Sequence, residues 1–399
     1  MSATLRSACL LAGAAIALGA GAGGGAGVGT GARAGDLQLV MLDRAKYPLA
    51  TCNDGTMAGY YVRKGSSATD WLVFQMGGGW CWDESTCASR SKSLTSSSGW
   101  ASTKTPQQGS ILAAADPALA AMSVVYAPYC SSDGWAGSAA AAPPTGFAFR
   151  GHDIVAAIFA DLGAAQGLGA AQGTRVLYGG CSAGARGALF NLDRVAFELL
   201  PAIVKRAGGS LARVGGLLDS AFWIDLVPLA PSATSFADQS RDVVALANAT
   251  SADASACKQA YPGELWKCVF GQYAVPFLRA DFFLHAYQYD LFQLSGDTGV
   301  PVPDKTPAEK AYCETFRNGT RASFARDVVQ QNGPGKNAGL LPACFKHCNT
   351  EGSTFSTLKT NGVTLEDAVA AWFFGEGSSP QYVVEDCAGF NCGNDCPPV

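Results

Sequence analysis

The residues best suited to carry out chemistry form a short serine motif flanked by glycines. Gly180-Cys181-Ser182-Ala183-Gly184 has the pattern G-x-S-x-G, with an apolar run at 174–178 before it and a long helical pattern after it. Such a strand-turn-helix holds a serine in a strained conformation and projects its hydroxyl above a sheet, because small neighbours avoid clashes there. We therefore predict that Ser182 is a nucleophile. The alternative is a glycine-rich turn that binds a phosphate or no ligand.

A serine hydroxyl is a weak nucleophile near neutral pH and needs a base, usually a histidine that a carboxylate orients. The chain has three histidines, His152, His285 and His347. In proteins with this motif the chain order is serine, acid, histidine, which disfavours His152. His285 lies in an apolar strand pattern typical of a core. His347, in a polar loop flanked by cysteines, is the predicted base, and the alternative is a loop histidine without a catalytic role.

Two aspartates are candidates for the acid that orients the base. Asp219 follows an apolar run at 214–218, and Asp290 comes soon after a second run at 281–287. We favour Asp290, because the acid most often follows the later strand. Either aspartate would also serve as a turn cap.

A glycine run supplies candidates for stabilising a developing negative charge. Gly77-Gly78-Gly79-Trp80 follows an apolar run at 71–76, and glycine lets backbone N–H groups approach a ligand closely. We assign the N–H groups of Gly78, Gly79 and Ala183 to an oxyanion hole, where losing one donor typically costs about 3 kcal/mol of transition-state stabilisation. The alternative is a tight glycine turn.

Short apolar runs alternate with helical patterns along the whole chain. This alternation predicts an α/β fold with a mostly parallel central sheet and helices on both faces. With the serine motif it predicts a fold of the α/β-hydrolase type, and the cysteine content predicts disulfide-rich loops. The predicted elements are strands at 71–76, 123–127, 174–178, 214–218 and 281–287 and helices at 153–162 and 185–200.

Composition limits the class of protein. The chain has 399 residues, of which 48% are hydrophobic and 15% charged, and a formal net charge of -4. These values favour a large folded core, and the lack of a basic block disfavours nucleic acid as a partner. We predict a single catalytic domain at 35–399.

The N-terminus has the pattern of a secretory signal peptide. Arg6 precedes an apolar run at 8–20, and Ala32-Arg33-Ala34 offers a small-x-small cleavage site. We predict a signal peptide at 1–34 and a secreted or secretory-lumen protein. A membrane anchor is disfavoured, because 19–31 is mostly glycine and alanine, and no later segment is long and apolar enough for a stable span.

Cysteine content agrees with secretion. Of the 14 cysteines, 13 lie beyond the predicted signal peptide, which suggests up to six disulfides and one odd thiol. A zinc site at Cys344, His347 and Cys348 or in the C-terminal cluster is the disfavoured alternative, and we expect no metal or cofactor. Asn248 and Asn318 begin N-x-T glycosylation triplets.

Over roughly 51–397 the chain resembles the pectinacetylesterase/Notum family of secreted α/β-hydrolases. The resemblance implies Ser182 as nucleophile, Asp290 as acid and His347 as base, and it leaves Asp219 a supporting role. A cysteine directly before the predicted nucleophile, as at Cys181, is similar to the pattern of the plant enzymes of the family. We interpret Cys181 as the unpaired thiol. The stretches that carry the resemblance are Thr51–Gly55, Gly59–Tyr61, Gly77–Cys81, Cys87–Arg90, Pro128–Asp133, Gly180–Gly184, Asp219-Ser220, Trp266–Cys268, Asp290 and Cys344–Cys348.

Two positions depart from the family pattern. Ala185 stands where the family often has another glycine, and a helix that has already begun there would tolerate it. Gly79 stands where Notum has a tryptophan, which would change the pocket beside the oxyanion hole.

These features together predict a secreted serine carboxylesterase, a monomer that removes O-acetyl groups from a pectin-like polysaccharide. One alternative is a Notum-like deacylase that removes a fatty acyl group from a protein. The other is a non-catalytic carbohydrate-binding protein whose tryptophans stack on sugars, although packing is the more frequent role of such residues. The tryptophans concerned are Trp80, Trp82, Trp100, Trp135 and Trp223.

Overall fold

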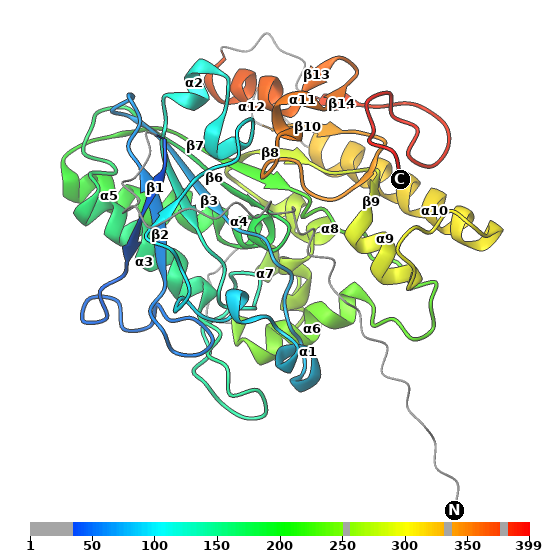
Figure 1. Cartoon of the computed structure of the whole chain (residues 1–399), viewed down its shortest axis with the longest axis horizontal. Helices are drawn as coiled ribbons and strands as arrows, with labels where there is room; N and C mark the ends of the chain where they lie inside the picture. The colour runs from blue at the N-terminus through cyan, green and yellow to red at the C-terminus, as the bar shows by residue number, and fades with distance from the viewer. Residues whose placement is uncertain (1–34, 250–255, 331–336, 376–381) are drawn as a thin grey trace, which may run out of the picture. The chain divides into compact units, whose positions relative to one another are not determined.

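A ten-stranded sheet forms the centre of the computed structural model, which describes residues 35–249, 256–330, 337–375 and 382–399. Its strand order is β14-β10-β8-β7-β6-β3-β5-β2-β1-β4 (Figure 1). The strands from β14 to β5 are all parallel, and β2, β1 and β4 are added antiparallel at one edge. The predicted signal peptide lies outside the described residues.

The parallel strands are short, apolar and rich in β-branched and aromatic residues, as strands covered on both faces require. The predicted strand at 123–127 has the bounds that the structure shows, whereas the strand predicted at 174–178 continues to Cys181. The sheet consists of β1 (Leu37–Met41), β2 (Gly59–Arg63), β3 (Asp70–Gln75), β4 (Thr103–Lys104), β5 (Ser123–Ala127), β6 (Thr174–Cys181), β7 (Leu211–Asp219), β8 (Asp281–His285), β10 (Ala338–Leu341) and β14 (Tyr382–Val384).

Helices cover both faces of the sheet, which confirms the predicted α/β-hydrolase fold class. Alternate residues of each strand point to opposite faces, so Val73 packs with one group of helices and Leu72 with the other. The first group includes α3 (Gly151–Ala165), α4 (Ala183–Arg194) and α10 (Pro307–Phe324), and the second includes α2 (Pro117–Ala120) and α12 (Leu365–Phe374). Other helices are α1 (Glu84–Ala88), α5 (Leu200–Ala207), α6 (Phe236–Leu246), α7 (Ala256–Ala260), α8 (Gly271–Ala274), α9 (Leu291–Thr298) and α11 (Thr354–Thr357).

The helix after the serine motif differs from its prediction at both ends. It begins at Ala183 rather than Ala185, so Ala185 lies in its first turn and needs no glycine conformation. It does not stop before Pro201. A π-helical turn at Val195–Leu199 joins α4 to α5, and Pro201 lies in the first turn of α5, where a missing N–H is tolerated.

Six disulfides tie the loops together, and one pairing corrects the sequence interpretation. Cys181 is joined to Cys348, with 5.8 Å between their Cα atoms, so it is not the unpaired thiol. The free cysteine among the described residues is Cys313, whose pKa burial raises to about 12. The other pairs are Cys52–Cys130, Cys81–Cys87, Cys257–Cys268, Cys344–Cys396 and Cys387–Cys392.

The fold also bears on the predictions about membrane spans and glycosylation. Within the described ranges, no helix has the length and apolar character needed to cross a membrane. Asn318 lies on α10, and its glycosylation stays a prediction, as does that of Asn248, whose triplet ends at a residue outside the described ranges.

Candidate active site

Ser182 occupies the sharp turn between β6 and α4. Its backbone has φ 56° and ψ -121°, a conformation that is costly for any residue except glycine. The flanking glycines are required, because a Cβ on Gly180 would lie 2.5 Å from the Gly184 carbonyl carbon and one on Gly184 would lie 2.1 Å from the Gln75 carbonyl oxygen. Strain at this point is typical of a nucleophile whose side chain is held clear of the sheet.

A short two-stranded parallel ladder brings the predicted acid and base together. In it, β9 (Tyr289–Asp290) pairs with β11 (Phe345–Lys346), so that Lys346 lies opposite Asp290 and His347 comes next. His347 Nδ1 donates a hydrogen bond to Asp290 Oδ2 over 2.7 Å. Asp290 also caps α9, since its Oδ1 accepts from the Gln293 N–H at 2.9 Å. Both carboxylate oxygens are therefore held in place.

The surroundings of His347 suit a general base. Its Nδ1 is engaged by Asp290, while its buried Nε2 has no hydrogen-bond partner among the described residues. Burial disfavours the imidazolium, but the charge of Asp290 and the hydrogen bond to it outweigh burial and raise the pKa of His347 above its ordinary value. The ring of Phe292 stacks on the imidazole at a centroid distance of 5.2 Å. His347 is thus oriented with one nitrogen available.

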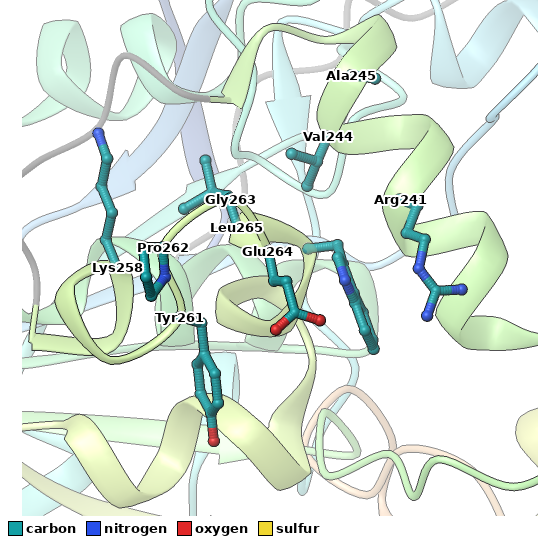
Figure 2. A pocket seen from close by; sticks show the side chains of 10 residues that line it. Arg241, Val244, Ala245, Lys258, Tyr261, Pro262, Gly263, Glu264 and Leu265 are labelled. Atoms are coloured by element: carbon teal, nitrogen blue, oxygen red, sulfur yellow. The ribbon is translucent and has the colours of Figure 1, made fainter.

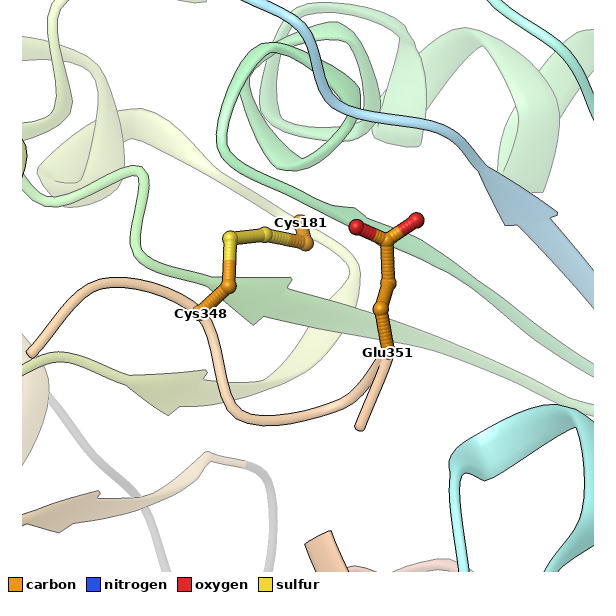
Figure 3. Close-up of side chains that lie close together, drawn as sticks. All are labelled: Cys181, Cys348 and Glu351. Carbon is orange, nitrogen blue, oxygen red and sulfur yellow. A yellow bond between two sulfur atoms is a disulfide. The ribbon is translucent and has the colours of Figure 1, made fainter. Parts of the chain in front are cut away.

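A disulfide links the segments that carry the serine and the histidine. Cys181 precedes Ser182 and Cys348 follows His347, and the bond between the two cysteines limits the Cα separation of Ser182 and His347 to about 13 Å. Figure 3 shows this disulfide with Glu351 beside it. Burial, together with the charge of Asp219, raises the pKa of Glu351 to about 7.

Asp219, at the end of β7, is hydrogen-bonded to both the serine turn and the segment that follows His347. Its carbonyl oxygen accepts from the Ser182 N–H at 2.9 Å, and its Oδ2 accepts from the N–H groups of Asn349 and Thr350, each at 2.8 Å. Ser220 contributes as well, since its Oγ accepts from the Cys348 N–H at 3.0 Å. These bonds give Asp219 the position of a structural support, as the family resemblance implies, and Asp290 is the aspartate that contacts His347.

The glycine loop lies against the serine. A Cβ on Gly77 would lie 3.1 Å from the Ser182 Cβ, which places the loop in direct contact with the turn. Gly78 has φ 139° and Gly79 φ 66°, so both positions favour glycine. The Gly78 carbonyl accepts from Arg90 Nη1 at 2.7 Å, and within the described ranges the N–H groups of Gly78 and Gly79 have no hydrogen-bond partner. They are available to an oxyanion.

One turn into α4, a buried arginine lies against two tryptophans whose rings are perpendicular to each other. The Arg186 N–H donates to the Ser182 carbonyl at 2.9 Å. Its guanidinium carbon lies 3.0 Å from the ring centroid of Trp80 and 3.9 Å from that of Trp223. Only 2% of Arg186 is exposed, and burial holds the pKa of its guanidinium well below the ordinary value.

The family model described as "Pectinacetylesterase" matches residues 31–397. The chain belongs to the pectinacetylesterase family. Members of the family are carboxylic ester hydrolases, and this chain is therefore one too.

Relatives named for different activities match to a similar degree. "Palmitoleoyl-protein carboxylesterase notum1a" of Danio rerio is 28% identical over 396 residues, 91% of this chain and 73% of the relative. "Pectin acetylesterase 11" of Arabidopsis thaliana is 28% identical over 381 residues, 90% of this chain and 93% of the relative. A solved structure of the Wnt deacylase Notum from Drosophila matches with a TM-score of 0.78 and 27% identity, covering 91% of this chain and all of that one. Family membership therefore leaves the acyl group and the alcohol open.

Other residues considered from the sequence lie elsewhere. His285 is fully buried in β8, as the apolar pattern predicted, and it pairs with Asp219. His152 is on α3, and its Nδ1 lies 2.8 Å from Asn191 Oδ1. The alternative zinc site has no thiolates to offer, because Cys344 and Cys348 are both in disulfides. Sequence reasoning did not identify Arg186 or Phe292, although their spacings from Ser182 and Asp290 place each of them within one helical turn of a site residue.

Neither the pocket beside α6 nor the buried tryptophans mark the serine. A pocket of about 780 Å³ lies beside α6, and its lining includes Tyr261 and Trp266 but none of the predicted site residues (Figure 2). Trp80, Trp135 and Trp223 are all buried, so their role is packing rather than sugar stacking at the surface. The chemistry is indicated by the strained serine and its neighbours.

Proposed function

We propose that this chain is a secreted serine esterase that removes acetyl groups from a pectin-like polysaccharide, with Ser182, His347 and Asp290 as its catalytic triad. The observation that carries the proposal is the strained Ser182 turn, joined through the Cys181–Cys348 disulfide to a histidine that already holds its aspartate. This is the constellation that activates a serine hydroxyl.

The proposed reaction has two steps. His347 Nε2 takes the proton of Ser182 as Oγ attacks the acyl carbonyl, and Asp290 stabilises the imidazolium that forms. The N–H groups of Gly78, Gly79 and Ala183 stabilise the tetrahedral oxyanion, and the alcohol leaves with the proton from His347. A water molecule, deprotonated by His347, then attacks the acyl-enzyme and releases the acid.

Comparison with a plant relative supports acetate as the acyl group. The chain is 28% identical to an Arabidopsis thaliana protein named pectin acetylesterase and covers 93% of its length.

A fatty deacylase is the second candidate. Its support is the TM-score of 0.78 with the Drosophila Wnt deacylase Notum and the 28% identity with a palmitoleoyl-protein carboxylesterase. The two candidates differ in acyl chain length, which a substrate series can measure.

The test compares 4-nitrophenyl esters of two to sixteen carbons, together with acetate release from acetylated polygalacturonate. We expect the highest kcat/KM for acetate and no turnover above background in Ser182→Ala. A preference for the longest chains would favour the fatty deacylase, and retained turnover in Ser182→Ala would end the triad assignment. Ser131→Ala, which alters a buried serine bonded to Asp133, is the matched control.

Secretion and a monomeric state are also part of the proposal. Six disulfides suit an oxidising compartment, and the signal-peptide pattern at 1–34 would direct the chain there. N-terminal sequencing of protein from the culture medium should begin near residue 35, and light scattering should give the mass of one chain.

A further inference from the structure

Arg186 is a buried cation without a counter-charge in the described part of the chain. Its Nε and Nη2 are both buried and have no hydrogen-bond partner there, and no carboxylate forms an ion pair with it. Burying an unpaired charge is costly, and an apolar side chain would fill the gap between two tryptophans at lower cost. Packing alone therefore does not account for an arginine at this position.

The two unpaired donors of Arg186, Nε and Nη2, form one edge of its guanidinium. Other arginines of this molecule use the same edge to bind carboxylates. Arg175 holds Asp70 through Nε at 2.6 Å and Nη2 at 2.9 Å. Arg326 holds Asp327 through the same two atoms, at 2.6 Å and 2.5 Å. Two parallel N–H groups match the two oxygens of a carboxylate, so the free edge of Arg186 has the geometry of a carboxylate site.

The segments around Arg186 are those that build the site. Its own backbone is bonded to Ser182, and Trp80 directly follows the glycine loop. On the other side, Trp223 stacks on Phe292 at 5.9 Å, and Phe292 stacks on His347 at 5.2 Å. The two tryptophan rings are perpendicular to each other, at 89°, and both contact the guanidinium. Nε and Nη2 keep no protein partner in the described part of the chain, so they are the donors left for a ligand.

We propose that Arg186 binds a carboxylate of the substrate and that the preferred substrate is an acetylated uronic-acid polymer with free acid groups. The inference rests on the proposed function and narrows its substrate class. Arg186 is a specificity-determining residue in this account, because it recognises a group next to the scissile ester and takes no part in bond making. Neutral polysaccharides and methyl-esterified uronates lack the charge that it would bind.

The test uses two matched substrates, an acetylated oligogalacturonate with free carboxylates and the same oligomer after methyl esterification. Acetate release gives kcat/KM for each, and the ratio of the two values reports recognition of the carboxylate. We expect a ratio of about 10 to 100 in the wild type, the range for a charge-assisted bidentate contact. Arg186→Met should bring the ratio close to one, and Arg186→Lys, which keeps the charge and loses the fork, should give an intermediate ratio.

Arg213→Met is the matched control. Arg213 also stacks on two rings, those of Trp372 and Phe373, and its Nε likewise has no partner among the described residues. It belongs to β7 and packs near α12, so the ratio in this variant should equal that of the wild type.

The outcomes separate this inference from the proposed function. A wild-type ratio near one, or an unchanged ratio in Arg186→Met, would overturn the inference while acetate release upheld the proposed function. If neither oligomer released acetate, both would fail. Should Arg186→Met not fold, the wild-type and Arg186→Lys ratios decide, and inhibition of the wild type by deacetylated oligogalacturonate should weaken about 10-fold or more on methyl esterification.

Discussion

The molecule contains two aspartate–histidine pairs with the same contact and different surroundings. In each, the histidine Nδ1 lies 2.7 Å from a carboxylate oxygen, and in each the Nε2 is buried without a partner among the described residues. The His285–Asp219 pair is completely inaccessible, whereas 15% of the His347 side chain is exposed. The same pair of side chains thus supports the core in one place and, in the proposed function, carries the chemistry in the other.

The carboxylates differ as much as the histidines. Burial raises the pKa of Asp219, but His285 and then the three hydrogen bonds that Oδ2 accepts from Asn349 and Thr350 outweigh it. The pKa of Asp219 therefore lies well below its ordinary value. Within the described ranges, the Asp290 carboxylate accepts two hydrogen bonds, one from the Gln293 N–H at the start of α9 and one from His347. The proposed reactive pair therefore differs by a partly exposed imidazole ring next to a strained serine, and the hydrogen bond alone does not identify it.

The largest contrast should come from replacing the two histidines. His347→Gln should lower kcat/KM for an acetyl ester by about 10,000-fold, because the proton acceptor is lost, with a change of about 1 kcal/mol in the free energy of unfolding. His285→Gln should cost about 3 kcal/mol in urea unfolding and keep activity within about tenfold. Equal losses of activity in the two variants would remove the distinction between the pairs.

Replacing the two aspartates should also separate a loss of activity from a loss of stability, with a smaller effect on activity than the histidine replacements. Asp290→Asn should lower kcat by about 100- to 10,000-fold, because the imidazole loses its orienting charge. Asp219→Asn should instead cost about 3–5 kcal/mol of stability, measured by denaturant unfolding, because it breaks a buried network. Asp116→Asn, at another helix N-cap, controls for the loss of a carboxylate charge at a cap, since asparagine caps a helix about as well as aspartate. A stable and active Asp290→Asn protein would contradict the assignment of the acid.

Two disulfides offer a third comparison. Replacing both Cys181 and Cys348 by alanine should lower kcat by about 10- to 100-fold, since the base loop is no longer tied to the serine turn. Replacing Cys344 and Cys396 should cost about 2–4 kcal/mol of stability and leave kcat within about threefold. Thermal unfolding and kcat of both double variants test this, and a larger kcat loss in the second would show that the first bond does not position the site.

The smallest expected effect is a shift of the pH profile. The raised pKa of His347 means that kcat/KM should fall as the pH drops through a value above 6.5, because the imidazolium cannot act as a base. The same raised pKa stabilises the fold below the unfolded-state pKa, and this contribution is lost as the pH rises through the folded-state pKa. Asp290→Asn should move the acidic limb to lower pH. An acidic limb that survives in His347→Gln would rule out this origin.

Much of this arrangement was predictable from local sequence. The G-x-S-x-G motif between a strand and a helix predicted the turn at Ser182, because few residues fit its backbone. Chain order led to His347, and the pattern after the later strand led to Asp290, which is the aspartate that contacts it. The glycine loop after β3 was also predicted, since its positive φ angles require glycine.

Features that depend on long-range packing were not predictable. The Cys181–Cys348 pairing joins residues 167 apart, and disulfide connectivity does not follow from cysteine spacing. The interpretation of Cys181 as a free thiol was wrong for that reason. The continuation of the helix past Pro201 depends on a π-helical turn, and the stacking of Arg186 depends on tryptophans from two distant loops.

The central claim is that Ser182 is the nucleophile and that His347, rather than His285, activates it. A fluorophosphonate probe followed by peptide mass mapping tests it most directly. We expect a single adduct on Ser182, formed at least about 100-fold more slowly in His347→Gln than in the wild type and at nearly the wild-type rate in folded His285→Gln. An adduct on another residue, or equal labelling rates in wild type and His347→Gln, would contradict the claim.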